Sequence, residues 1–487
     1  MGSGTNAVKL STGANNDFIA KYAPNGTLLW VRQIVSGYWE YYSKIMLDAA
    51  GNVYVAGELT GNATLGTITL TAAATGNTVF LAKLDSNGNP LWATTVLSNA
   101  IEPNVGLAVD PKTGNSYVVG GFSKSATVFT SPVTTLTSAG GNDAFIVKYS
   151  SLGVAQWAKS YGGTGDDAAD SAAIDPSGNP VITGSFTSSA QFGATTLTSS
   201  SSSANDFVAK INAADGSVAW AAPLTSTSTS GPPSYGNVDP TSRIAVDAAG
   251  NVYTTGSFDG TIQLDPTGGA DAVQGTNSAF ISKLDNNGNF VWGKAFTTAP
   301  NGYDVEGFGI AVDPKGDVFS TGTFAWTVNF DPNGSSVGNL TAIGVSYDIY
   351  LSELDTIGNF VNAQVFGGPG EDGGSMVSAD ANGNIYLTGL SYGPATFGKL
   401  IVGGANEQDI FVARLSSSVA TKANVPPSFT LQGPLPQAVG LNAPPQTVPN
   451  FIGNIVPGLP GEANELVNFI VTTDNHSLFT ATGQPAI

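Results

Sequence analysis

The chain has no cysteine and a single histidine, His476, among its 487 residues. The absence of cysteine excludes disulfides, thiolate metal sites and cysteine nucleophiles, and it leaves the redox compartment open. A single imidazole excludes histidine metal clusters and gives little basis for histidine acid–base catalysis. We therefore expect no required cofactor, no enzymatic activity, and an ordinary turn role for His476.

Basic residues are also scarce, because 17 Lys and Arg face 36 Asp and Glu, for a net charge of −19. So few cations cannot neutralise the phosphate backbone of a nucleic acid or the surface of an anionic membrane. We therefore expect neither nucleic acid nor a membrane as a partner. No apolar run approaches the roughly 18 residues that cross a bilayer. The first residues, MGSGTN, lack the basic and apolar regions of a signal peptide, so an export signal is expected elsewhere or upstream.

What the chain does have is an internal repeat. Phrases such as LDAAGNVYVAG and VDPKGDVFSTG recur six times at intervals of roughly 60 to 70 residues, the order of magnitude of propeller repeats. The first acid of each copy falls at Asp48, Asp110, Asp175, Asp247, Asp313 and Asp380. Because this acid recurs in every copy, we interpret it as a turn former through side-chain to backbone hydrogen bonds.

A second phrase, such as DFIAKY or AFIVKY, recurs seven times, and a Trp-bearing segment usually follows it. Two copies of this phrase have Glu353 and Arg414 in place of the lysine. Because the residue type varies, we interpret this position as an exposed one on a strand. The lysines are Lys21, Lys83, Lys148, Lys210 and Lys283, and the tryptophans are Trp30, Trp92, Trp157, Trp220 and Trp292, with Asn362 in the sixth copy.

Each repeat predicts four short antiparallel strands. Asp-x-x-Gly-Asn and Asn-Gly segments are hairpin turns, and the runs between them are β-branched and aromatic, without a helical period. One such unit leaves a hydrophobic face open, so successive units must pack on one another. The sequence therefore predicts an all-β fold, a β-propeller of four-stranded antiparallel blades, with six blades favoured and seven left open.

These motifs resemble the bacterial β-propeller repeats of exported proteins, written D-x-x-G-N-x-Y-x-x-G followed by D-x-F-v-x-K-l and a tryptophan. The resemblance covers roughly residues 5 to 415. It implies a secreted or cell-surface location and a propeller fold, and it implies no particular activity.

Three segments are expected along the chain. Residues 1–415 form the propeller, closed by pairing of N-terminal outer strands with the last blade, and residues 416–428 form a proline-containing linker. Residues 429–487 resemble the start of an immunoglobulin-like or cadherin-like module and lack later strands that a complete sandwich of about 100 residues needs. We expect either a fragment of a longer protein or a tail that folds against the propeller or a neighbouring chain.

Two acidic loops, YGGTGDDAAD and FGGPGEDGG, precede inner strands. Their carboxylates are hard oxygen ligands of the kind that calcium accepts, although solvated acidic loops are the commoner case and no EF-hand spacing is present. The candidate calcium ligands are Asp166, Asp167, Asp170, Glu371 and Asp372.

The corresponding loops elsewhere are aromatic. Exposed aromatic rings bind flat apolar faces, including those of sugars, and the alternative is that they plug the channel or pack on adjacent blades. The candidate ligand-binding residues are Tyr38, Trp39, Tyr41, Tyr42, Tyr235 and Tyr303.

The pattern as a whole favours a non-catalytic extracellular module of a larger bacterial surface or secreted protein. It would present one loop face to a protein or glycan as a structural, adhesive or binding module. One alternative is a carbohydrate-active propeller enzyme that uses channel carboxylates. A second alternative is a subunit that self-associates through open β-edges or through its C-terminal module.

Overall fold

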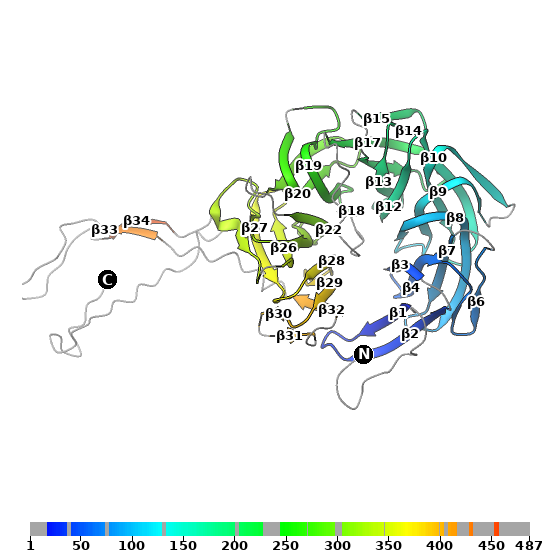
Figure 1. The fold of residues 1–487 in the computed structure, drawn as a ribbon, viewed down its shortest axis with the longest axis horizontal. Helices are drawn as coiled ribbons and strands as arrows, with labels where there is room; N and C mark the ends of the chain where they lie inside the picture. The colour runs from blue at the N-terminus through cyan, green and yellow to red at the C-terminus, as the bar shows by residue number, and fades with distance from the viewer. Residues whose placement is uncertain are drawn as a thin grey trace, which may run out of the picture. The chain divides into compact units, whose positions relative to one another are not determined.

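Strands make up nearly all the regular structure of the chain in a computed structural model (Figure 1). Two compact units are distinguished, Met1–Val419 and Ala420–Ile487. The described part of the chain contains no α-helix, and no helix there is long and apolar enough to cross a membrane. The described residues are 17–36, 40–73, 77–128, 133–199, 204–226, 244–269, 271–297, 304–344, 346–398, 400–403, 408–415, 428–431 and 452–456.

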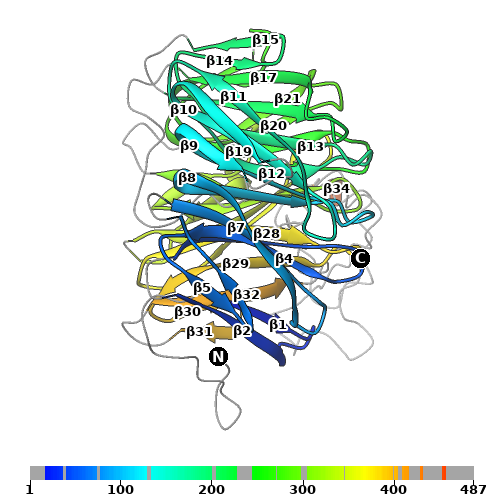
Figure 2. The same cartoon turned by 90° about the vertical axis from the view of Figure 1, so that its right-hand side faces the viewer.

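The first unit is a β-propeller, whose antiparallel sheets follow one another around a ring (Figures 1 and 2). Five blades have four strands each. Blade 1 is β3 (Glu40–Leu47), β4 (Val53–Leu59), β7 (Asn77–Leu84) and the first part of β8 (Pro90–Val109). Blade 2 is the rest of β8 with β9 (Ser116–Val128), β10 (Thr134–Tyr149) and β11 (Ala155–Gly163).

The next three blades repeat this pattern, so the predicted fold class is confirmed. Blade 3 is β12 (Asp167–Ile174), β13 (Pro180–Phe186), β16 (Asn205–Ile211) and β17 (Val218–Ser226). Blade 4 is β18 (Ile244–Val246), β19 (Val252–Gln263), β20 (Ala272–Leu284) and β21 (Phe290–Phe296). Blade 5 is β22 (Val305–Val312), β23 (Val318–Phe324), β26 (Asp348–Leu354) and β27 (Phe360–Phe366).

The described residues form five complete blades rather than the six that the sequence favours. In the described part of the chain, the sixth repeat has three blade strands, β28 (Asp372–Ala379), β29 (Ile385–Tyr392) and β32 (Gln408–Leu415). The N-terminal strands β1 (Asp17–Tyr22) and β2 (Leu28–Ser36) pair with each other and not with β32 in the described residues. The reason is that β1 and β32 are copies of the same repeat strand, and β1 already occupies the edge of β2 that β32 would need.

The repeated aspartates form the turns between the first and second strands, as predicted. Asp48 Oδ1 accepts from the backbone N–H of Ala50 and Asn52 at 3.0 and 2.9 Å, and Oδ2 accepts from the Asn52 side chain at 2.8 Å. Gly51 has φ +75°, a conformation that costs side chains energy, which explains glycine there. Asp85, Asp285 and Asp355 build the turns between third and fourth strands in the same way.

A lysine and a tryptophan of one unit form hydrogen bonds to the next unit. The indole Nε1 donates to a turn carbonyl of the following blade, and the lysine Nζ donates to the same carbonyl at 2.8 to 3.5 Å. The pairs are Trp30 with Ser86, Trp92 with Ser151, Trp157 with Ala213, Trp220 with Asn286 and Trp292 with Thr356, at N···O distances of 3.1 to 3.3 Å. We call this arrangement the inter-blade latch.

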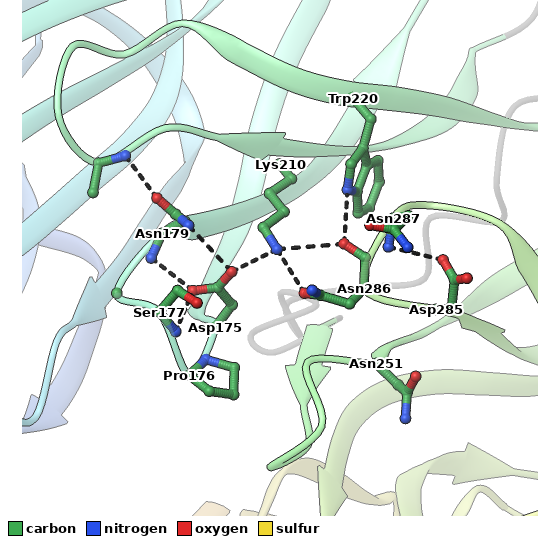
Figure 3. A network of polar contacts seen from close by, with 12 residues as sticks. Asp175, Pro176, Ser177, Asn179, Lys210, Trp220, Asn251, Asp285, Asn286 and Asn287 are labelled. Carbon is green, nitrogen blue, oxygen red and sulfur yellow. Dashed lines mark hydrogen bonds and ion pairs between the residues drawn. The ribbon is translucent and has the colours of Figure 1, made fainter.

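The expectation that these lysines are exposed is therefore wrong for the blades. Lys83, Lys148, Lys210 and Lys283 are buried. Figure 3 shows Lys210 between the carboxylate of Asp175 in its own blade, at 2.5 Å, and Asn286 of blade 4. The burial of these lysines could not be predicted from the sequence pattern. A cation on a strand between polar turns is expected to be solvated, and only the neighbouring blade covers it.

Apolar residues fill the space between consecutive blades rather than one central core. Ile146 of blade 2, for example, belongs to the same buried cluster as Ile182 and Phe207 of blade 3. Each blade thus buries its two faces against its neighbours, as stacked repeats require.

Strand alternation divides the connections between two faces of the propeller. The turns that contain the repeated Asp or Asn-Gly lie on one face, which we call the turn face. The remaining connections lie on the other, the loop face, and several carry small hairpins that pair with the outer strand of the preceding unit, as β5 does with β2. These hairpins are β5 (Ala63–Leu65) with β6 (Ile68–Leu70), β14 (Ser189–Phe192) with β15 (Thr195–Thr198), β24 (Thr327–Asn329) with β25 (Asn339–Thr341), and β30 (Ala395–Phe397) with β31 (Leu400–Val402).

The second unit contains two described strands, β33 (Ser428–Leu431) and β34 (Ile452–Val456), which pair in antiparallel fashion. The rest of the predicted linker and partial immunoglobulin-like module lies outside the described residues, so that assignment stays a prediction.

Candidate functional site on the loop face

The predicted aromatic site falls mostly on parts of the chain outside the described residues. Tyr38, Trp39, Tyr235 and Tyr303 lie there. Tyr41 and Tyr42 belong to strand β3 rather than to the loop before it, and only their backbone is described. The aromatic site therefore stays a prediction.

The acidic loops are described, and their carboxylates hold backbone in place. Asp166 accepts from the N–H of Asn142 at 3.1 Å. Asp167 accepts from the N–H groups of Gly163 at 2.7 Å and Thr187 at 3.3 Å. The first acidic loop thus ties β11 and β13 together at the junction between blades 2 and 3.

The second acidic loop repeats this construction between blade 5 and the sixth repeat. Asp372 accepts from the N–H groups of Gly368 at 2.8 Å and Tyr392 at 3.2 Å. Asp170 is buried and Glu371 is exposed. The five predicted ligands therefore divide between two separate junctions.

The structure adds a second carboxylate to each loop, which the sequence analysis missed. An alanine side chain at Gly162 would contact both Asp143 Oδ1 and Asp167 Oδ2, at 2.6 and 2.8 Å. A side chain added at Gly367 would likewise contact both Asp348 Oδ1 and Asp372 Oδ2. The sequence does carry a signal for these partners, because each is an aspartate two residues before the aromatic position of the third strand of its blade, at Asp143 and Asp348.

Burial and mutual repulsion perturb these two carboxylate pairs. Asp348 and Asp372 are 0% and 2% exposed. Burial, with Asp372 nearby, raises the pKa of Asp348 to about 7, and burial raises the pKa of Asp372 to about 6. Burial, with Asp143 and Asp166 nearby, likewise raises the pKa of Asp167 to about 6. Two adjacent buried carboxylates favour sharing one proton over double ionisation.

Calcium gains no positive support from this geometry. In the described part of the chain, no three or more Asp, Glu, His or Cys side chains are placed to hold a metal ion. Each acidic loop offers two converging carboxylate oxygens, whereas calcium takes six to eight oxygen ligands. Calcium binding stays a prediction.

A third acid, Asp304, organises the loop face between blades 4 and 5. Its carboxylate accepts from Tyr347 Oη at 2.5 Å and from the side chain of Asn277, and its backbone oxygen accepts from the N–H of Ala325 at 3.1 Å. The backbone oxygen of Tyr347 in turn accepts from the N–H of Asp372 at 2.8 Å. These bonds join two neighbouring junctions into one polar network.

An exposed tryptophan lies next to this network. Trp326 follows Ala325 directly, is 50% exposed and has φ +62°. Asn277 also has a positive φ, of 44°. Two of the four described residues other than glycine with positive φ thus border Asp304, and strained backbone of this kind concentrates at functional sites.

Positions equivalent to Trp326 lie two residues after Phe122, Phe186 and Phe258 in blades 2 to 4. Lys124, Ser188 and Gly260 hold these positions, and all three have positive φ. Glycine or a small polar residue suits this conformation, and a tryptophan does not. The local backbone therefore does not explain the choice of tryptophan.

Comparison with known proteins gives limited similarity. No known family model matches the chain. It is 29% identical over 199 residues to an uncharacterised WD repeat-containing protein, L264, of Acanthamoeba polyphaga mimivirus. The match covers 35% of this chain and 14% of that relative, so the chain spans a small part of the relative's length.

The similar solved structures include proteins of different kinds. A protein of unknown function from Dyadobacter fermentans is 10% identical, with a TM-score of 0.37, and the match covers 77% of this chain and 94% of that one. A leech intramolecular trans-sialidase is 8% identical, with a TM-score of 0.38, and the match covers 79% of this chain and 69% of that one. Similarity at this level carries no information on activity.

Proposed function

We propose that the chain is a non-catalytic extracellular binding module of a larger bacterial surface or secreted protein, and that it contacts a protein or glycan partner through the loop face. One observation carries the proposal. The recurring charged residues of the repeat serve turns and latches, while the loop face diverges between repeats and exposes Trp326. Divergence within a ring of equivalent loops is how a repeat scaffold acquires a specific surface.

The extracellular location rests on the resemblance to repeats of exported proteins. Fractionation of the native organism with an antibody against the propeller tests it directly. Signal in the culture medium or on intact cells supports the proposal, and signal confined to the cytoplasm contradicts it.

Binding is tested by presenting the purified chain to intact bacterial and host cells and to immobilised glycans. Retention that is lost on changing the loop face but kept on changing the turn face supports the proposal. Leu152→Ala, an exposed turn-face residue, is a suitable control. Equal loss of retention for both faces would contradict a loop-face site.

The enzyme alternative would use the paired carboxylates. Asp348 and Asp372 are neighbouring carboxyls whose pKa values burial raises to about 7 and about 6, but both groups are buried, whereas glycosidase carboxylates must reach the substrate. Product release from a polysaccharide library that disappears in Asp348→Asn would favour the enzyme over the binding module.

Self-association is a second candidate, favoured by the open side of the sixth repeat. Val412 in β32 is 60% exposed, whereas its counterparts Ile146 and Ile281 are fully buried against the next blade. Ile410 on the same strand is also exposed. The equivalent strand face is covered in every other repeat. Exposed on β32, this apolar face is a surface on which a further β unit can pack, including one from a second copy of the chain.

Mass photometry of the wild type and Val412→Asp tests this second candidate. Oligomers that dissociate in the variant support association through β32. Leu152→Asp, on the turn face, controls for added charge. Monomers for all three proteins would contradict self-association.

A further inference from the structure

We propose that two copies of this chain associate head to tail, with the sixth repeat of one copy packing on the N-terminal hairpin β1–β2 of the other. These are the last and the first unit of the ring (Figure 1). The inference rests on self-association, the second candidate function, and names the surface that β32 contacts.

The first surface lies on β32. In the other repeats, the third strand directs an aliphatic side chain at the next unit, as Ile146 of blade 2 packs in one buried cluster with Phe207 of blade 3. Val412 holds this position in β32 and is 60% exposed. The equivalent residues, Ile19, Leu81, Ile146, Val208, Ile281 and Leu351, are 0 to 6% exposed. The sixth repeat therefore presents a junction surface that the single chain leaves exposed.

The second surface lies on β1–β2. The aromatic residue of the third strand faces the preceding unit, as Phe145 does in a cluster with Tyr54 and Leu81 of blade 1. Phe18 holds this position in β1 and is partly exposed. The equivalent residues, Phe80, Phe145, Phe207, Phe280, Tyr350 and Phe411, are 0 to 4% exposed. The hairpin thus presents the opposite side of a junction, the side that a preceding unit covers elsewhere.

The turn after β1 is open in the same way. An added side chain at Gly26 would meet nothing within 4 Å. At the equivalent glycines of blades 1 to 5 it would contact the tryptophan of the preceding unit; these are Gly88, Gly153, Gly216, Gly288 and Gly358. Phe18 and Gly26 therefore show, independently of each other, that no described unit covers this side of the hairpin.

The polar residues of the two surfaces also match. Arg414 is exposed at the latch position of β32, and its guanidinium can donate to a carbonyl as the latch lysines do. At each latch the acceptor carbonyl lies three residues after the latch position of its own unit, as Ser86 does after Lys83. The acceptor on the hairpin is accordingly the carbonyl of Pro24, three residues after Lys21.

A second copy is the partner that carries the matching half. Each chain has one surface of each kind, and both are exposed in the single chain. Packing of Val412 and Ile410, which is 64% exposed, on the ring of Phe18 would remove these side chains from water, as at the other junctions. Because the two surfaces differ, the contact is head to tail, and it builds either a closed ring or an open row of copies.

The test mixes two variants, each with one surface disabled. Val412→Asp keeps the hairpin surface, and Phe18→Asp keeps the β32 surface. A carboxylate buried without a partner opposes packing, so we expect each variant alone to associate about ten-fold or more weakly than the wild type by analytical ultracentrifugation. An equimolar mixture is expected to form dimers and nothing larger, because only one junction can form.

The mixture also separates docking from folding. The dimer needs only the unchanged surface of each chain, so a local loss of structure around Phe18 does not prevent it. Leu152→Asp, at a turn residue of blade 2 that is 79% exposed, is the control for added charge and should associate as the wild type does.

Three outcomes would overturn the inference. If Phe18→Asp associates as the wild type does, or if the mixture stays monomeric while the wild type associates, self-association stands and the hairpin is not its partner surface. A monomeric wild type, including one in which the two surfaces close on each other within the chain, rejects both. Binding through the loop face is decided by the retention experiment and not by these results.

Discussion

Asp48 and Asp348 carry the same side chain in opposite electrostatic settings. Burial disfavours ionisation of Asp48, but hydrogen bonds from Asn52 and the nearby Lys83 outweigh it and hold its pKa below the usual range. Asp348 faces another carboxylate in the interior, and burial raises its pKa to about 7. At the residue scale, the identity of the neighbour decides whether an aspartate stabilises the charged or the neutral form.

Asp348→Asn should flatten the dependence of stability on pH. The folded-state pKa lies above the ordinary value of 3.8, so this group's stabilisation is complete below about pH 4 and is lost as pH rises through 7. Each pKa unit corresponds to about 1.4 kcal/mol. We expect the variant to melt higher than the wild type at pH 8, with little difference at pH 4, by circular dichroism.

Asp380→Asn is the control for this prediction. Asp380 forms an exposed turn, and hydrogen bonds from Asn384 lower its pKa, so its replacement should not improve stability at pH 8. A wild-type melting temperature that rises between pH 5 and 8 would show that the Asp348 carboxyl does not hold a proton in the folded state.

The inter-blade latch is the recurring device at the scale of strands and blades. It joins a lysine and a tryptophan on one unit to one carbonyl on the next, and the glycine of that turn packs on the indole. An added side chain at Gly88 or Gly288 would meet the ring of Trp30 or Trp220 at 2.8 or 2.7 Å. Neighbouring repeats therefore constrain one another through a few side chains at each junction.

Lys210→Met should destabilise the propeller. The substitution leaves the buried Asp175 without its ion-pair partner and removes the bonds to Asn286. Loss of one partner of a buried pair costs about 3 to 5 kcal/mol. Urea unfolding measures the change. Lys159→Met, at an exposed position, should change stability by less than about 0.5 kcal/mol, and equal effects would argue against a latch.

Blade 5 departs from this arrangement. Glu353 takes the place of the lysine and Asn362 that of the tryptophan. Burial, with Asp317 and Asp313 nearby, raises the pKa of Glu353 to about 7, and its Oε2 is buried without a hydrogen-bond partner. At neutral pH this blade lacks the charge balance of its neighbours.

Glu353→Lys should therefore stabilise the chain. The new ammonium group would lie beside Asp313 and Asp317, as Lys83 lies 3.3 Å from Asp48. The gain should be larger at pH 8 than at pH 5, because Glu353 ionises as pH rises through about 7 and its repulsion then grows. Glu353→Gln separates removal of charge from restoration of a cation. A lower melting temperature for Glu353→Lys at pH 8 would contradict this account.

The whole molecule is expected to be most stable in mildly acidic solution. Turn aspartates such as Asp48 and Asp175, with lowered pKa values, lose their stabilisation as pH falls below about 4. Asp167, Asp348 and Asp372, with raised values, lose theirs as pH rises from about 4 through 7. The net charge of −19 adds repulsion on the alkaline side.

Urea unfolding at pH 3, 5 and 8 measures this profile. We expect the greatest free energy of unfolding at pH 5. Added salt at pH 8 should raise the stability by screening the net negative charge. A maximum at pH 8 would mean that the buried carboxylates are not protonated in the native state.

Sequence patterns were sufficient for the repeat unit because its signals are local. Asp48 and Asn52 lie four residues apart and bond to each other, so the turn can be predicted from that segment alone. The strand of Phe145 and Lys148 is likewise evident from alternation. Ring closure could not be predicted, because β1 and β32 carry the same pattern and only spatial pairing decides which one takes the edge of β2.

The sequence by itself determined the strands, the turns, the propeller class and the lack of cysteine and near-lack of histidine, since each depends on composition or on residues a few positions apart. Tertiary structure alone decided which distant residues meet. It placed Lys210 against Asn286, Asp143 against Asp167, and Asp348 against Asp372. These contacts cross junctions between blades, where neighbouring side chains come from separate repeats, so no local pattern specifies the electrostatics of the site.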